Sequence, residues 1–168
     1  MAKRSFGAAS YTPTATADTT NLANSTYQSI GASGATAGLN VLEIYIGGQA
    51  SASSINIMQF ARDSTLAVAS ALVAPNTDGP LDTRTAALAA VPITCTLAST
   101  PPQRSVAITA ARLHLSLNTF GGIVRWVAAP GEEWGITGVT VNISESSLSA
   151  FTGGSAGLCG SHIIYEPF

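Results

Sequence analysis

The sequence predicts an all-β protein, a β-sandwich or jelly-roll-like antiparallel barrel of about eight to ten short strands. The first sign is side-chain alternation between Arg104 and Ile143, with apolar residues on one face (Leu113, Leu115, Leu117) and polar residues on the other (Arg112, His114, Ser116, Asn118). A period of two is typical of a half-buried strand. The second sign is the recurrence of glycine or proline between most strand-like segments, together with the lack of any long segment at the helical period of about 3.6 residues.

The segment from Arg104 to Ile143 is predicted to be a meander of three strands. The glycines of the turn 118–122 permit a positive φ after the first strand. The second strand is expected over 123–128, Pro130–Gly131 supplies the next turn, and the third strand is expected from Trp134 to Ile143. Such a meander identifies an antiparallel domain, but it specifies no chemistry.

Further strand candidates flank the meander, at residues 26–30, 41–46, 54–61, 91–98, 147–151 and 158–165. Alternation in 41–46 places Leu42, Ile44 and Ile46 on one face and Val41, Glu43 and Tyr45 on the other. The segment 54–61 is apolar on both faces, which is typical of a central strand. Residues 66–74 are expected to form strand or loop, and 83–90 a helical turn.

The length of 168 residues suits one domain with a substantial core, and we expect a single β domain over 25–168. Residues 1–24 are rich in Ala, Thr and Ser, and they are expected to form an extended N-terminal arm. Phe6 and Tyr11 are the only aromatic residues of this segment, so they are the candidate partner-binding residues, with which the arm would grip a neighbouring subunit. A poorly ordered tail is the alternative.

Composition indicates a neutral surface. Charged residues make up 10% of the chain, against about 25% in an average domain. Such a surface is solvated by hydroxyl groups or covered by neighbouring subunits, and the low charge favours the second. The net charge of −2 and the lack of a basic run beyond Lys3–Arg4 count against direct binding of nucleic acid. Neither a membrane-spanning stretch nor a secretory signal is apparent, so synthesis in the cytoplasm is expected.

Residues 153–157 fit the hydrolase pattern G-x-S-x-G, but the context of that motif is missing. A hydrolase needs a helix after the serine and an acid and a histidine in chain order. Here a strand-like segment follows, and no carboxylate lies between Ser155 and His162. A glycine-rich turn explains the same letters, so we expect no catalytic residue and no enzyme activity.

The acidic residues and histidines do not form a metal or cofactor site in the sequence. Asp78 and Asp82 offer too few oxygen ligands for a calcium loop. Glu132 and Glu133 are adjacent, so on a strand they would point in opposite directions. His114 and His162 have no second ligand at a metal-binding spacing. We therefore expect no metal and no cofactor.

Cys95 and Cys159 are expected to be buried free thiols, with a disulfide between them as the alternative. Trp126 and Trp134 flank the Pro-Gly turn, and a cross-strand pairing would bring them together. Packing in the core is the expected role of this pair. Stacking on a sugar ring is the alternative.

Three runs of sequence carry a resemblance to a known class of proteins: VLEIYIGGQASASSINIMQFARDS, FGGIVRWVAAPGEEW and LSAFTGGSAGLCGSHIIYEPF. They resemble small structural proteins of tailed bacteriophages, most of all the head decoration, or cement, proteins. The resemblance covers most of the chain from Leu39 onward and consists of strand and turn segments. It implies a compact β-rich module, often trimeric, that sits on the assembled major capsid protein and reinforces it.

The expected function is therefore that of a virion structural protein on the capsid surface, with the major capsid protein as partner and a homotrimer as the assembly. A carbohydrate- or receptor-binding β module of a phage tail or head fibre is the alternative, and it rests on Trp126 and Trp134. A hydrolase that uses Ser155 is a weaker third hypothesis.

Overall fold

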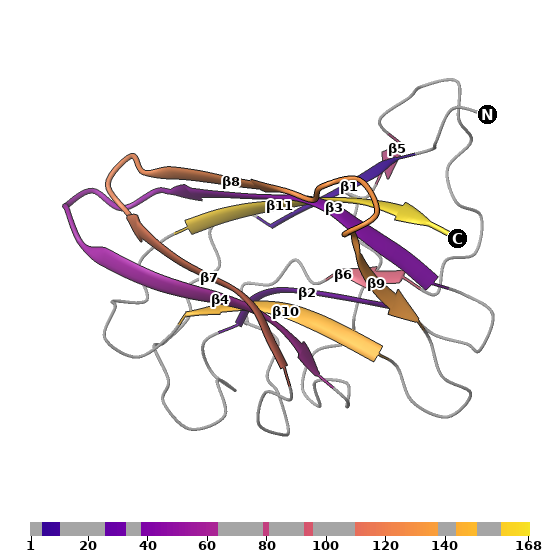
Figure 1. Ribbon diagram of the computed structural model, residues 1–168. Helices are drawn as coiled ribbons and strands as arrows, with labels where there is room; N and C mark the ends of the chain where they lie inside the picture. Colours follow the sequence, from indigo (N-terminus) through magenta and orange to yellow (C-terminus); the bar gives the residue numbers. More distant parts are fainter. Residues whose placement is uncertain are drawn as a thin grey trace.

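A computed structural model describes residues 5–10, 26–32, 38–63, 79–80, 93–95, 110–137, 144–150 and 159–168. Regular structure within these ranges consists of strands alone, and all their pairings are antiparallel (Figure 1). The all-β prediction is therefore confirmed for this part of the chain. Within the same ranges there is no helix of the length and apolar character that crossing a membrane requires. The predictions for Tyr11, for Ser155 and for residues 66–74 and 83–90 concern positions outside the described residues.

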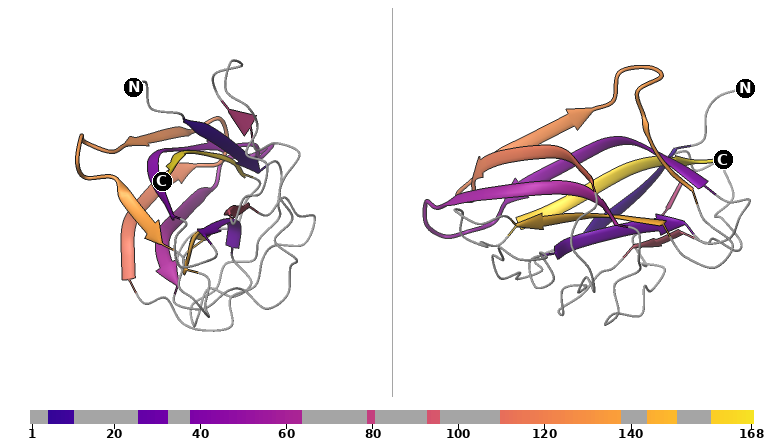
Figure 2. Two further views of the ribbon diagram at one scale, coloured as in Figure 1. Left: turned by 90° about the vertical axis from the view of Figure 1, so that its right-hand side faces the viewer. Right: turned by 60° about the horizontal axis from the view of Figure 1, so that its bottom comes forward.

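The strands form two sheets. The first contains β5 (Gly79–Pro80), β1 (Phe6–Ser10), β11 (Cys159–Pro167), β3 (Gly38–Gly48) and β8 (Ile123–Val127) in that order, with β9 (Trp134–Thr137) also paired to β3. The second contains β6 (Ile93–Cys95), β2 (Thr26–Ala32), β10 (Ser144–Ala150), β4 (Ile55–Asp63) and β7 (Ala110–Asn118). Figures 1 and 2 show the sheets as two layers, with the first above the second in Figure 1.

One hydrophobic core holds side chains from both sheets. The first sheet contributes Ile44, Ile46 and Ile163, and the second contributes Met58 and Phe60, all fully buried. A stack of aromatic rings joins the two layers: the Phe60 ring lies 5.2 Å from that of Trp134, which lies 3.9 Å from that of Trp126. The expected role of the tryptophan pair in packing is thereby confirmed, because both rings also pack against the core.

The alternation predicted for β7 is confirmed, since Leu113, Leu115 and Leu117 pack into the core and their neighbours are exposed. The predicted meander is wrong. β7 pairs with β4 in the second sheet, whereas β8 and β9 both pair with β3 in the first. The turn after Asn118, in which Gly122 N donates to Asn118 O at 2.9 Å, carries the chain from one layer to the other. The apolar side chains of β7 and β8 thereby pack against the same core from opposite layers.

A β-bulge at Leu42 shifts the alternation of β3. Ile164 is opposite Glu43, but the next residue, Tyr165, is opposite Val41, so Leu42 is the extra residue. Val41 is therefore buried, and its predicted place beside Glu43 and Tyr45 on the outer face is wrong. Periodicity alone cannot detect one inserted residue, because the sequence on each side of it still alternates.

The same bulge coincides with a loop in the neighbouring strand. Residues 128–133 leave the sheet between β8 and β9, and Ala128 N donates to Leu42 O at 2.8 Å. Gly131, at a φ of 83°, makes the reversal possible. β8 and β9 thus act as one interrupted strand along β3.

Phe6 lies in the core, which differs from the extended arm that we expected over 1–24. Residues 6–10 form β1 between β5 and β11, and the Phe6 ring is stacked 5.8 Å from that of Tyr165. Pairing with β11 satisfies the backbone of this segment and buries its one large side chain, which offsets the cost of ordering it. Phe6 is therefore not exposed for contact with a neighbouring subunit.

Cys159 is a free, buried thiol, as expected, and it is not bonded to Cys95, whose side chain lies outside the described residues. Burial raises the pKa of the Cys159 thiol, and a hydrogen bond from Asn56 acts in the opposite direction. Asn56 Nδ2 lies 3.5 Å from the Cys159 sulfur. This thiol is therefore protonated at neutral pH and serves as a small apolar group of the core.

We predict that Phe6→Ala lowers the free energy of unfolding by about 3 to 5 kcal/mol, the usual cost of truncating a buried phenylalanine. Phe6 is 2% exposed, whereas Phe120, at 59%, is the matched control, and Phe120→Ala should change stability by no more than about 0.5 kcal/mol. Urea denaturation of the three proteins measures both effects. Equal stability of the two variants would show that β1 contributes nothing to the core.

Candidate functional site

The outer face of the first sheet brings charged and aromatic residues from three strands together. Beyond the bulge, Glu43 and Tyr45 of β3 point outward, away from the buried Ile44 and Ile46. In the register of the sheet, Tyr45 is opposite Arg125 of β8 on one side and His162 of β11 on the other. Side chains that are opposite one another in antiparallel strands share a face, so these residues form one patch.

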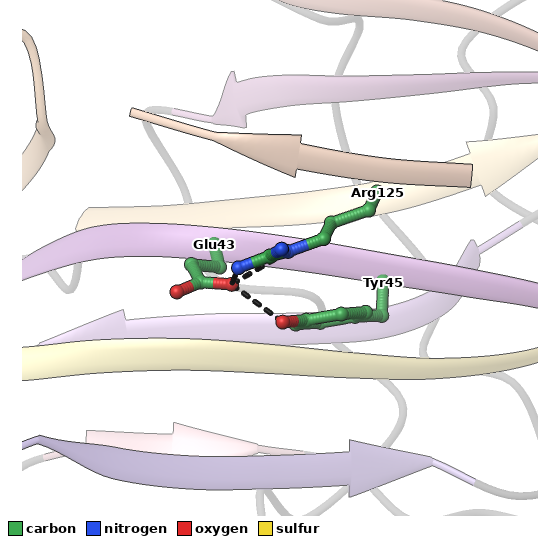
Figure 3. Close-up of polar contacts among 3 residues, drawn as sticks. All are labelled: Glu43, Tyr45 and Arg125. Carbon is green, nitrogen blue, oxygen red and sulfur yellow. Dashed lines mark hydrogen bonds and ion pairs between the residues drawn. The ribbon is translucent and has the colours of Figure 1, made fainter. Parts of the chain in front are cut away.

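Glu43 is the centre of the polar contacts in this patch (Figure 3). Arg125 donates to Glu43 Oε2 from Nη2 at 2.8 Å and from Nε at 3.0 Å. The Tyr45 hydroxyl donates to the same oxygen at 2.6 Å. The Arg125 guanidinium also lies 5.3 Å from the centre of the Tyr45 ring, within the range of a cation–π contact. The two charges therefore neutralise each other on the sheet surface.

These contacts shift the ionisation of both acidic groups. The hydrogen bond from Tyr45, followed by the hydrogen bond and charge of Arg125, lowers the pKa of Glu43, although partial burial acts in the opposite direction. The bond to Glu43 raises the pKa of Tyr45, because the neutral phenol is the donor. At neutral pH the patch therefore holds a carboxylate, a guanidinium and a neutral phenol.

A hollow of about 400 Å³ opens beside this patch. Its sides include Tyr45, His162 and Ile123, and glycines of three segments line it (Gly47, Gly48, Gly121, Gly160). A Cβ added at Gly47 would meet no atom within 4 Å, so the space exists because the side chain is missing. The Tyr45 and His162 rings lie 6.2 Å apart, and His162 Nε2 is buried without a hydrogen-bond partner. The hollow is thus apolar with one unsatisfied nitrogen near its wall.

The other residues considered from sequence lie elsewhere. The Trp134 ring lies between those of Trp126 and Phe60, so its two faces are occupied. His114 is on the outer face of the second sheet, where its Nε2 lies 3.3 Å from Gln59 Nε2. Across the described ranges, no group of three or more His, Cys, Asp or Glu residues could hold a metal ion.

Comparisons with protein-family models, with curated proteins and with solved structures gave no significant match. The patch and the hollow are therefore interpreted from their geometry. Sequence reasoning missed the patch. The spacing of Glu43 and Tyr45 by two residues on one strand was a usable signal, whereas Arg125 joins them only through the fold.

We predict that Tyr45→Phe raises the pKa of Glu43 toward its ordinary value, because the phenol hydrogen bond is the largest cause of its lowering. Carbon-detected NMR titration of the Glu43 carboxyl measures this. Since the folded pKa is below the unfolded one, the carboxylate adds stability that is present above about pH 4.5 and is lost as the pH falls through the folded pKa. Arg125→Gln should shift the titration in the same direction. An unchanged titration in both variants would contradict the contacts of Figure 3.

Proposed function

We propose that the two sheets form a jelly-roll sandwich. Four of the antiparallel pairs, β1–β11, β2–β10, β3–β8 and β4–β7, are those of one long hairpin ribbon whose turn lies between β4 and β7. Two more pairs, β11–β3 and β10–β4, are those that form when this ribbon is rolled up. The order β1-β11-β3-β8 facing β2-β10-β4-β7 is the double Greek key of jelly rolls, a fold of viral capsid and lectin domains.

We infer from this strand order that the chain is a virion structural protein that binds the outer surface of a phage capsid and stabilises it. The strand order is the observation that carries the proposal, and the low charge of the chain supports it. A homotrimer with the major capsid protein as partner is part of the same proposal and rests on the resemblance to decoration proteins. A protein that binds only the assembled shell stabilises that state by mass action, so many weak contacts suffice.

One end of the molecule offers a surface for this contact in place of Phe6. The β3–β4 and β7–β8 connections lie side by side there, since Ala50 N donates to Thr119 O and Thr119 N to Ser54 O, each at 2.9 Å. Ile55 and Phe120 are exposed at this end, and we call them the apolar tip. Exposed apolar residues that lie together mark contact surfaces on soluble proteins.

We predict that the double variant Ile55→Ser, Phe120→Ser loses co-sedimentation with purified capsids of its own virus. Phe168→Ser is the matched control, because Phe168 is 62% exposed, against 65% for Ile55 and 59% for Phe120, and it lies outside the tip. Neither variant removes a core side chain, so both should fold. Binding that is intact in the double variant excludes the tip as the contact, and failure of the unaltered chain to bind excludes the decoration role.

The hollow favours a second candidate, a carbohydrate- or receptor-binding module. Aromatic walls beside an open apolar floor suit the face of a sugar ring, and Tyr45 and His162 supply such walls. The tryptophan pair does not carry this alternative, because the faces of Trp134 are occupied.

We predict, for this second candidate, that Gly47→Val fills the hollow and abolishes binding on a glycan array while leaving capsid binding unchanged. The φ of Gly47 is not positive and its Cβ position is open, so valine fits the strand. Ser116→Val, at an exposed position on β7, is the control for added surface apolarity. If the unaltered chain binds no glycan, or if Gly47→Val binds as well as it does, the hollow is not a sugar site.

A further inference from the structure

The outer margin of the first sheet is formed by β8, which pairs with β3 and with no second strand among the described residues. In Figure 2, β8 lies at the margin of its layer in both views. Two hydrogen bonds at the ends of β8 show which of its residues direct their backbone groups toward β3. Gly48 N donates to Gly122 O, and Ala128 N donates to Leu42 O, both at 2.8 Å. In an antiparallel pair, alternate residues direct their backbone groups to the partner. The N–H and C=O groups of Ile123, Arg125 and Val127 therefore point away from β3.

The side chains of these three residues leave the edge apolar. Ile123 is 78% exposed and Val127 49% exposed. Soluble proteins commonly protect an edge strand with a charged side chain. Arg125 is the charge on β8, but its guanidinium bends back across the sheet to Glu43 (Figure 3). Within the part of the chain that the structure describes, the edge thus presents backbone groups with no partner strand and two exposed aliphatic side chains, without a projecting charge.

We propose that the edge of β8 pairs with β8 of a second copy of this chain, antiparallel and about a twofold axis at Arg125. The edge is self-complementary in this register. Ile123 of each copy comes opposite Val127 of the other, so two aliphatic pairs form on the outer face. The outward backbone groups of the three residues meet their equivalents, and each opposed pair exchanges two N–H···O bonds. A contact that uses one patch on both subunits is the form that twofold symmetry requires.

The charges on the strand permit this contact. Two arginines opposite each other would repel if they were bare. Here each Arg125 is already bonded to Glu43 of its own chain at 2.8 Å, so the two centres meet as neutral ion pairs. The contact would use Ile123, which also forms one side of the glycine-lined hollow, whereas the apolar tip is a separate feature. The inference does not depend on the proposed role at the capsid. A twofold contact also differs from the contacts within a trimer, and where trimers form it joins them in pairs.

The first test measures the mass of the assembly by light scattering at micromolar concentration. Ile123→Lys with Val127→Lys places charges on the edge without removing a core side chain, so the fold should be retained and circular dichroism should match that of the unaltered chain. The unaltered protein should have twice the mass of the variant. Equal masses would overturn the proposal.

The second test locates the contact. Arg125→Cys places a thiol at the twofold axis, where the Cα atoms of the opposed residues would be about 5.5 Å apart. A short bifunctional thiol reagent should then give a covalent dimer. Arg112→Cys, on the exposed margin of the second sheet, is the matched control and should give none, and Cys159 is buried in both. A change in mass without a cross-link at 125, or an equal cross-link at 112, would show that copies meet through another surface and would overturn the proposal.

Discussion

The pairing of β11 with β3 is the contact on which the architecture depends. It places β11 between β1 and β3 and so converts separate strand pairs into one continuous layer. Ile163 lies beside Ile44 and Tyr165 beside Val41, and all four side chains are fully buried. The bulge at Leu42 allows this, because one extra residue keeps both halves of β3 turned toward the core although the strand is long and twisted.

The outer face of the first sheet follows from the same pairing. Residues of β11, β3 and β8 meet there only because these strands are neighbours, which sets His162, Tyr45 and Arg125 in one row. The polar groups of Tyr45 and Arg125 are both bonded to Glu43, which accepts a hydrogen bond from each. What faces outward is then mainly aromatic, aliphatic and glycine surface, which is suited to contact with another molecule.

Sequence patterns predicted the strands better than their partners. The alternation of β7 and the central place of β4 could be seen because each depends on residues close together in the chain. The alternation pattern could not show whether the three predicted strands pair with one another. Strand pairing depends on which apolar faces come together to enclose a common core, and those faces belong to segments far apart in the sequence. Phe6 was assigned to an arm because its neighbours are small, and its partner Tyr165 is far away in sequence. The Glu43–Arg125 contact was hidden for the same reason.

The place of β1 beside β11 has a consequence for how the chain folds. β1 precedes the other described strands in the chain, and its neighbour β11 follows them, so β1 is synthesised well before its partner. Closing so long a loop costs entropy before any contact is gained, and folds dominated by such pairings form slowly. During synthesis β1 must therefore remain without this partner, with its backbone open to other chains. A chaperone that covers β1 during that interval would keep it from pairing with other chains.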